Sequence, residues 1–164
     1  MKTLLLMRHA KSSWSNSGLD DHDRPLNKRG RQAAPEMGKL LRKQGLIPDL
    51  ILCSTARRAR ETADLVAKAC DYAGKIEPQR DLYYSDAACY MDILCHLPDS
   101  AGRVLLIGHN PETEGLLEVL TGLHERMPTA AVAHVDLPIS HWIELTEALD
   151  VRLLNLWRPG PPES

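Results

Sequence analysis

The chain contains three short runs of apolar residues, and each run stops abruptly at polar or charged residues. Continuous apolar runs of this length are typical of strands buried on both faces of a parallel sheet. They predict strands over residues 3–7, 49–54 and 103–109. A shorter stretch over residues 75–78 predicts one more strand.

Apolar residues at helical spacing separate these strands. Asn27 is a good N-cap and predicts a helix over residues 28–43. Ser85 is expected to cap another, over residues 86–96, and Pro111 suits the first turn of a helix that runs to about residue 120. The remaining helix is predicted over 56–71. The residues expected to face the core are Ala33, Met37, Leu40 and Leu41 in the first helix and Ala59, Ala63, Val66 and Ala67 in the second.

From residue 130 onward the pattern alternates as in strands joined by short turns, over residues 130–137, 141–148 and 151–157. The whole pattern predicts an α/β fold, a three-layer α/β/α sandwich whose sheet is mostly parallel with an antiparallel edge. Residues 1–158 are expected to form a single domain and residues 159–164 a flexible C-terminal tail.

The totals exclude several classes of protein. A net charge of −2 over 164 residues lacks the basic excess that a nucleic-acid or membrane surface needs. The apolar run over residues 4–7 is too short for a signal peptide or a membrane span, so a cytoplasmic location is expected. A monomer is the default expectation for the oligomeric state. Cys53, Cys70, Cys89 and Cys95 show no metal-site spacing, so we expect reduced thiols and neither a metal nor another cofactor.

Unusual polar residues follow each of the three strongest strands. Arg8 and His9 follow the first strand, and Arg58 opens the helix after the second. His109 follows the third. Because ligands of parallel sheets bind beyond the carboxyl ends of the strands, we expect these side chains to lie together. Arginine forks and helix N-termini both suit a phosphoryl group, so the sequence predicts a phosphate site.

Two histidines beside arginines indicate transfer of that group. One imidazole, held neutral by a carbonyl on Nδ1, would attack phosphorus through Nε2, since nearby arginines disfavour imidazolium. The other would donate a hydrogen bond to oxygens that gain charge in the transition state. The acidic segment around His22, residues 20–23, is interpreted as an exposed polar turn rather than a metal loop.

Four motifs resemble the histidine phosphatase superfamily, also called phosphoglycerate mutase-like: LMRHAKSSW, DRPLNKRG, CSTARRARET and LIGHNPE. The short length and the RPL and GHNP forms are similar to its SixA-type branch of phosphohistidine phosphatases. The resemblance implies a phosphoglycerate mutase-like fold, with His9 as the nucleophile and Arg8 as the phosphate-binding residue beside it. It aligns Arg58, rather than Arg57, with the second catalytic arginine, and His109 with the second catalytic histidine.

The resemblance also gives weaker candidates around this centre. Arg24, Lys11, Ser15 and Asn16 are candidates for outer contacts to phosphate or substrate.

Many members of the superfamily carry a glutamate after the third strand as general acid. Here the alignment places Tyr84 at that position, with Asp81 and Asp86 close by as further candidates. An alcohol leaving group needs a proton donor, whereas a phosphorylated imidazole can be protonated before its bond breaks. The missing glutamate therefore favours phosphoramidate substrates.

We therefore expect a metal-independent phosphatase that dephosphorylates protein phosphohistidine, in a phosphorelay or phosphocarrier protein, through a phospho-His9 intermediate. The alternative is a phosphomonoesterase that uses the same site on a small phosphorylated metabolite, for example a sugar phosphate. A non-catalytic phospho-ligand binding domain ranks below both, because both histidines and both arginines are present. A mutase is disfavoured because the chain is short for the insertions that retain its intermediate. Neither nucleic acid nor a membrane is expected as a partner.

Overall fold

A six-stranded mixed sheet forms the middle layer of the structure. The computed structural model describes residues 1–160, so residues 161–164 of the predicted tail lie outside the described residues. The strand order is β3-β2-β4-β1-β5-β6. β1 to β4 pair in parallel, whereas β5 runs antiparallel to β1, and β6 antiparallel to β5. The strands are β1 (Lys2–Arg8), β2 (Leu50–Ser54), β3 (Ile76–Gln79), β4 (Arg103–Gly108), β5 (Val132–Leu137) and β6 (Arg152–Trp157).

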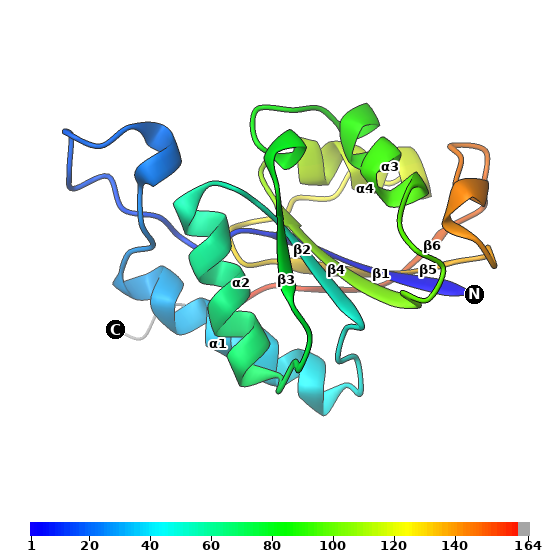
Figure 1. Ribbon diagram of the computed structural model, residues 1–164, viewed down its shortest axis with the longest axis horizontal. Helices are drawn as coiled ribbons and strands as arrows, with labels where there is room; N and C mark the ends of the chain where they lie inside the picture. The colour runs from blue at the N-terminus through cyan, green and yellow to red at the C-terminus, as the bar shows by residue number, and fades with distance from the viewer. Residues whose placement is uncertain (161–164) are drawn as a thin grey trace.

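Helices cover both faces of this sheet (Figure 1). They are α1 (Lys28–Lys43) and α2 (Arg57–Ala69) on one face, and α3 (Ala87–Cys95) and α4 (Glu112–Thr121) on the other. Successive side chains of a strand point to opposite faces. Leu5 and Met7 of β1 therefore pack with the first pair of helices, and Leu4 and Leu6 with the second pair. The predicted three-layer fold, mostly parallel with an antiparallel edge, is confirmed.

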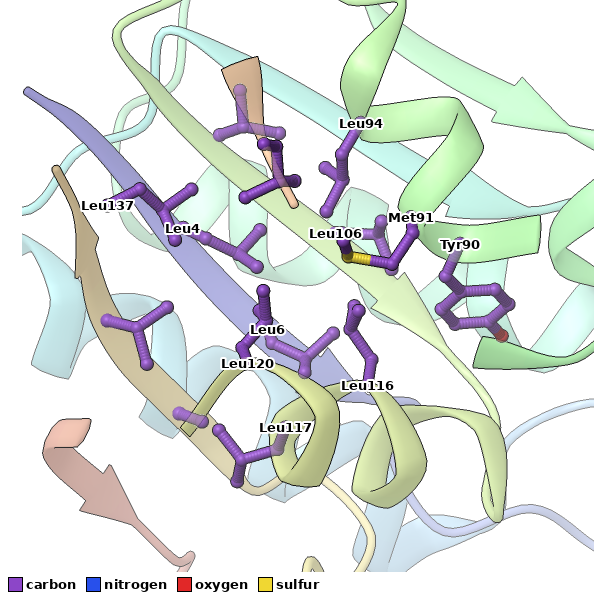
Figure 2. Packing of buried hydrophobic residues seen from close by; sticks show 14 of the residues in the cluster. Leu4, Leu6, Tyr90, Met91, Leu94, Leu106, Leu116, Leu117, Leu120 and Leu137 are labelled. Carbon is purple, nitrogen blue, oxygen red and sulfur yellow. The ribbon is translucent and has the colours of Figure 1, made fainter. Parts of the chain in front are cut away.

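The larger hydrophobic core lies between the sheet and helices α3 and α4 (Figure 2). Leu6 of β1 and Leu106 of β4 meet Leu116 of α4 there, and all three side chains are fully buried. Burial of one such leucine stabilises the fold by about 1.5–3 kcal/mol. Tyr90 of α3 extends this core toward the end of β4, where its hydroxyl donates to the Leu82 carbonyl at 2.9 Å.

The predicted strand over residues 141–148 is wrong. This segment contains a 3-10 turn, Trp142–Glu144, that packs over the sheet instead of extending it. The fully buried Trp142 ring fills the larger core, and its Nε1 donates to the Ala101 carbonyl at 2.8 Å. Trp142 and Leu145 are the buried apolar residues of this segment, and their spacing of three is that of a turn rather than of a strand. In Figure 1 the segment lies beside the N-terminus, at the edge of the sheet formed by the amino ends of β1 and β4.

Two local predictions need smaller corrections. Asp86, rather than Ser85, caps α3, since its carboxylate accepts the Cys89 N–H at 2.8 Å. In α1 the buried positions include Ala34 and Gly38 in place of the predicted Ala33 and Leu40, which are only partly buried. The four residues predicted to face inward on α2 are all buried.

Within residues 1–160, no helix combines the length and the apolar character that crossing a bilayer demands.

The carboxyl ends of β1 and β4 lie next to each other in the middle of the sheet. Arg8 pairs with Gly108 in their parallel register, and the His9 N–H donates to the Gly108 carbonyl at 3.0 Å. After β1 the chain leads to α1 on one face, and after β4 it leads to α4 on the other. Such a point of divergence is where open α/β sheets bind ligands.

Candidate active site

A cavity of about 360 Å³ opens at this carboxyl edge. Its walls come from the ends of β1 and β4, the first turns of α2 and α4, the segment after η2 (Arg80–Leu82), and the long connection between β1 and α1. That connection is the blue loop that extends to the left in Figure 1. The residues that line the cavity are Arg8, His9, Lys11, Ser12, Trp14, Arg24, Arg58, Tyr83, Tyr84, His109, Asn110, Pro111, Glu112 and Thr129.

His9 is held in one tautomer on the floor of this cavity. Its Nδ1 lies 2.7 Å from the Ala10 carbonyl oxygen, which can only accept, so Nδ1 carries the proton and donates. Nε2 then bears the lone pair. Burial, together with the nearby His109, Arg58 and Arg8, lowers the pKa of His9 to about 3. The ring is therefore neutral at physiological pH and is suited to nucleophilic attack through Nε2.

His109 lies beside it, with 5.1 Å between the two ring centroids. Its Nε2 lies 2.8 Å from the hydroxyl of Ser54 at the end of β2. Burial and the Arg58 guanidinium lower the pKa of His109 to about 4. A dianionic ligand between the rings would oppose both effects and favour a protonated, hydrogen-bond-donating His109.

Arg58 is oriented by the acidic segment that the sequence pattern assigned to an exposed turn. Its Nη1 donates to the Asp21 carbonyl at 2.8 Å, and its Nη2 donates to Asp21 Oδ2 at 3.1 Å. The hydroxyl of Tyr83 donates to the same carboxylate oxygen at 2.6 Å. Although partial burial opposes it, these hydrogen bonds and the charge of Arg58 lower the pKa of Asp21 to about 2.

Arg24 joins the same network from the other side of Asp21. Its Nε donates to Asp21 Oδ1 at 3.1 Å and its Nη1 to the Ser12 hydroxyl at 3.0 Å. The exposed Trp14 ring covers the guanidinium, with Cζ only 3.4 Å from the ring centroid. Arg24 is thereby buried and fixed, and it contributes a third guanidinium to the cavity.

Arg8 completes the basic lining. Its Nη1 donates to the Met127 carbonyl at 3.2 Å. Burial lowers the pKa of Arg8 from its ordinary value, Glu114 opposes that shift, and Arg58 adds to it by like-charge repulsion. Three guanidiniums that face one cavity repel one another, so an anion bound between them is stabilised. Each cation within about 4 Å of the anion contributes roughly 4 kcal/mol of attraction at an effective dielectric near 20, before the cost of desolvation. The N-terminal turns of α2 and α4 add the positive ends of two helix dipoles.

Sequence comparison decides the family. The profile of the histidine phosphatase superfamily (branch 1) matches residues 4–83. An uncharacterized protein of Mycobacterium tuberculosis (strain H37Rv) is 32% identical over 150 residues, and the match covers 85% of this chain and 91% of that protein. The chain belongs to the histidine phosphatase superfamily.

Solved structures agree with this assignment. A protein classed as the phosphohistidine phosphatase SixA of Agrobacterium tumefaciens is 29% identical and superposes with a TM-score of 0.83 over 96% of this chain and 98% of its own. A SixA-classed protein of Nakamurella multipartita is 26% identical, with a TM-score of 0.81 over 96% of both chains. A mycobacterial glucosyl-3-phosphoglycerate phosphatase, only 18% identical, shares the fold with a TM-score of 0.69 over 97% of this chain and 99% of its own.

The structure of this histidine phosphatase separates the weaker candidates. Lys11 and Arg24 line the cavity, whereas Ser15 and Asn16 do not. The Ser15 hydroxyl bonds to Ser13 at 2.8 Å, and Asn16 accepts the Gly18 N–H at 3.0 Å. Both are exposed and make their hydrogen bonds within their own loop.

The candidate proton donors separate in the same way. Tyr84 lines the cavity, but the residue is 82% exposed. Asp81 and Asp86 do not line it, and Asp86 is engaged as the cap of α3. Among the described residues that do line it, the only carboxyl belongs to Glu112, at the start of α4.

Three residues in or beside the cavity escaped the sequence analysis of this histidine phosphatase: Asp21, Tyr83 and Glu112. The local pattern around Asp21 is that of a polar turn, and its role arises from Arg58, 37 residues later. Glu112 stands inside the LIGHNPE motif, three residues after His109, and that spacing on a helix start was a usable signal.

Within residues 1–160 no three side chains of histidine, cysteine, aspartate or glutamate gather as metal ligands would. The cavity lining includes three arginines, Arg8, Arg24 and Arg58.

Proposed function

We propose that this histidine phosphatase dephosphorylates protein phosphohistidine through a covalent phospho-His9 intermediate. The observation that carries the proposal is the state of His9. Its Nδ1 is tied to a backbone carbonyl, its ring is neutral, and it lies in a cavity lined by three arginines and a second histidine. This is the arrangement that an imidazole nucleophile attacking a phosphoryl dianion requires.

The reaction has two displacements at phosphorus. In the first, the lone pair of His9 Nε2 attacks, and the bond between phosphorus and the substrate imidazole breaks. In the second, water attacks phospho-His9 and releases inorganic phosphate. Arg8 and Arg58 hold the equatorial oxygens through both steps, and His109 donates to them once the bound dianion favours its protonation.

The rim of the cavity favours a large substrate over a small one. Trp14 and Tyr84 both line the cavity, yet these residues are 75% and 82% exposed. Tyr84 also has a φ of 48°, in the left-handed region that residues other than glycine rarely adopt, at a cost of about 1–3 kcal/mol. Two exposed aromatic rings at the mouth suit contact with a protein surface and with a planar imidazole. The similarity to proteins classed as SixA supports the same substrate class.

The rival is a phosphomonoesterase for a small metabolite, and one observation favours it. The sequence argument against it was the missing glutamate, but Glu112 places a carboxyl in the cavity. A proton donor for an alcohol leaving group is therefore at hand. A phosphatase of glucosyl-3-phosphoglycerate shares this fold.

We also propose that turnover needs no metal, because arginines supply the positive charge a cation would bring. Turnover that persists in excess EDTA is the expected result. A cytoplasmic location and a monomeric state stay predictions of the sequence, which cell fractionation and light scattering test.

The decisive assay compares release of phosphate from a phosphohistidine phosphocarrier protein with release from a panel of sugar phosphates. Preference for the phosphocarrier by at least tenfold in kcat/KM is expected, and preference for a sugar phosphate would establish the rival. His9→Ala should abolish turnover while phosphate binding persists. An acid-labile, base-stable phosphoryl group trapped on His9 would exclude a non-catalytic binding domain. Turnover retained by the variant would refute the nucleophile assignment.

A further inference from the structure

Glu112 is a carboxyl in the catalytic cavity to which neither the motifs nor the family comparison assigns a part. It is the first residue of α4, three positions after His109, and it lines the cavity together with both histidines. Its Oε2 atom is buried and has no hydrogen-bond partner among the residues that the structure describes. Buried carboxyl oxygens are almost always hydrogen-bonded, so an orphaned one beside a substrate cavity points to a partner that arrives with the substrate.

The surroundings of Glu112 favour its protonated form. Burial raises the pKa of its carboxyl, its own backbone N–H opposes that shift, and the Asp86 carboxylate at the start of α3 raises it further. Tyr90 lies close enough for Glu112 to raise the pKa of the phenol in turn. None of the three arginines contributes to the shift at Glu112, whereas Arg58 lowers the pKa of both histidines.

Two other groups near the cavity, the Tyr83 hydroxyl and the Asp21 carboxyl, are less suited to proton donation. The Tyr83 hydroxyl is committed to Asp21 at 2.6 Å, and burial and this bond raise its pKa well above the ordinary value. Asp21 is held as a carboxylate between two arginines, with a pKa lowered to about 2 despite partial burial. Asp21 therefore has no proton to donate at neutral pH, and the Tyr83 hydroxyl is too weak an acid to donate readily.

We propose that Glu112 is the proton donor to the leaving group in the first step and the base for water in the second. This inference rests on the proposed two-step function of the site. It also accounts for the missing glutamate after the third strand, because α4 supplies the carboxyl from the other side of the cavity.

The protons and electron pairs balance in both steps. First, the bond from His9 Nε2 to phosphorus forms, and the P–N bond to the substrate imidazole breaks with its electron pair left on nitrogen. Glu112 gives its proton to the other ring nitrogen, so a neutral imidazole departs. Next, the Glu112 carboxylate removes a proton from water, whose oxygen bonds to phosphorus as His9 leaves as a neutral imidazole. Phosphate is released and Glu112 is protonated again.

The test uses Glu112→Gln, which keeps the shape of the side chain and removes the exchangeable acid. Glu118→Gln is the matched control, since Glu118 lies on the same helix with a half-exposed side chain outside the cavity. Circular dichroism and urea unfolding establish that both variants fold. The probes are a series of aryl phosphates, from a strongly acidic nitrophenol to a weakly acidic phenol as leaving group.

Proton donation predicts a loss that depends on the leaving group. With phenyl phosphate, Glu112→Gln should slow formation of phospho-His9 by about 10²–10⁴-fold. With a nitrophenyl phosphate, the first step needs little acid catalysis. Rapid mixing of Glu112→Gln with this probe should therefore show a burst of one nitrophenol per enzyme, followed by slow hydrolysis of phospho-His9. Glu118→Gln should match the wild type on every probe.

The outcomes distinguish a failure of this inference from a failure of the proposed function on which it rests. The role of Glu112 would be overturned if Glu112→Gln slowed the reaction equally for all leaving groups, or for none of them, and left the nitrophenol burst unchanged. In that case phospho-His9 still forms, and the proposed function stands. A wild-type enzyme that forms no phospho-His9 with any probe, or with a phosphohistidine phosphocarrier, would instead overturn the proposed function.

Discussion

Thr62 couples the helix that carries Arg58 to the backbone that orients His9. Its side chain is fully buried on α2, one turn after Arg58. The Thr62 hydroxyl accepts the Ala10 N–H at 3.0 Å and donates to the Arg58 carbonyl at 2.7 Å. The Ala10 carbonyl is the acceptor that fixes His9 Nδ1. Thr62→Val keeps the volume of the side chain and removes only the hydroxyl, so it isolates this link.

The size of the effect follows from what is left unpaired. In Thr62→Val the buried Ala10 N–H loses its acceptor, which costs about 1–3 kcal/mol. The Arg58 carbonyl keeps its helical hydrogen bond and adds little. A central value of about 2 kcal/mol corresponds to a melting temperature lowered by roughly 4–8 °C for a chain of this size. Thr62→Ser keeps the hydroxyl and loses one methyl group, for which about 1 kcal/mol is expected.

Urea unfolding of the three proteins measures these differences, with m-values expected to stay equal. Amide hydrogen exchange adds a local readout, because the Ala10 N–H should lose protection in Thr62→Val and keep it in Thr62→Ser. The turnover number of Thr62→Val should also fall, since the Ala10 backbone, whose carbonyl orients the His9 ring, is held less firmly. A Thr62→Val protein within about 0.5 kcal/mol of the wild type, or a Thr62→Ser protein destabilised as much, would refute the reasoning.

Two further predictions concern the same end of the sheet. The folded-state pKa values of His9 and His109, about 3 and about 4, lie below the ordinary histidine value. The unfolded chain therefore binds protons first, so stability is complete above pH 6.5 and falls as the pH drops toward 4, by roughly 2–3 kcal/mol per histidine at about 1.4 kcal/mol per pH unit. Between pH 7.5 and 4.5, the free energy of unfolding in urea should decline less steeply for His109→Gln than for the wild type. Identical slopes for the two proteins would contradict a buried, neutral His109. Separately, a Cβ at Gly108 would lie 2.5 Å from the Tyr90 hydroxyl, which accepts the His109 N–H. Gly108→Ala should cost about 1–3 kcal/mol and weaken phosphate binding in calorimetry, whereas unchanged values of both would show that the ring moves aside freely.

The sequence alone determined the strands that build the sheet and the side chains that follow them. Apolar runs located β1, β2 and β4 because a strand covered on both faces has no polar positions to interrupt it. The ends of these runs located Arg8, His9 and His109, since the carboxyl ends of parallel strands meet at one edge of a sheet.

Only the tertiary structure determined which other residues complete the site at that edge of the sheet. The contact of Asp21 with Arg58 joins residues 37 positions apart, so the local pattern of a polar turn carries no trace of it. That the Glu112 carboxyl lines the same cavity as His9 and Arg58 depends on the packing of segments that are distant in sequence. Likewise, alternation over residues 141–148 predicted a strand, but a 3-10 turn forms there and places Trp142 and Leu145 in the larger core. Local periodicity records which face of an element is buried, whereas the partners of a loop side chain are set by distant segments that folding brings beside it.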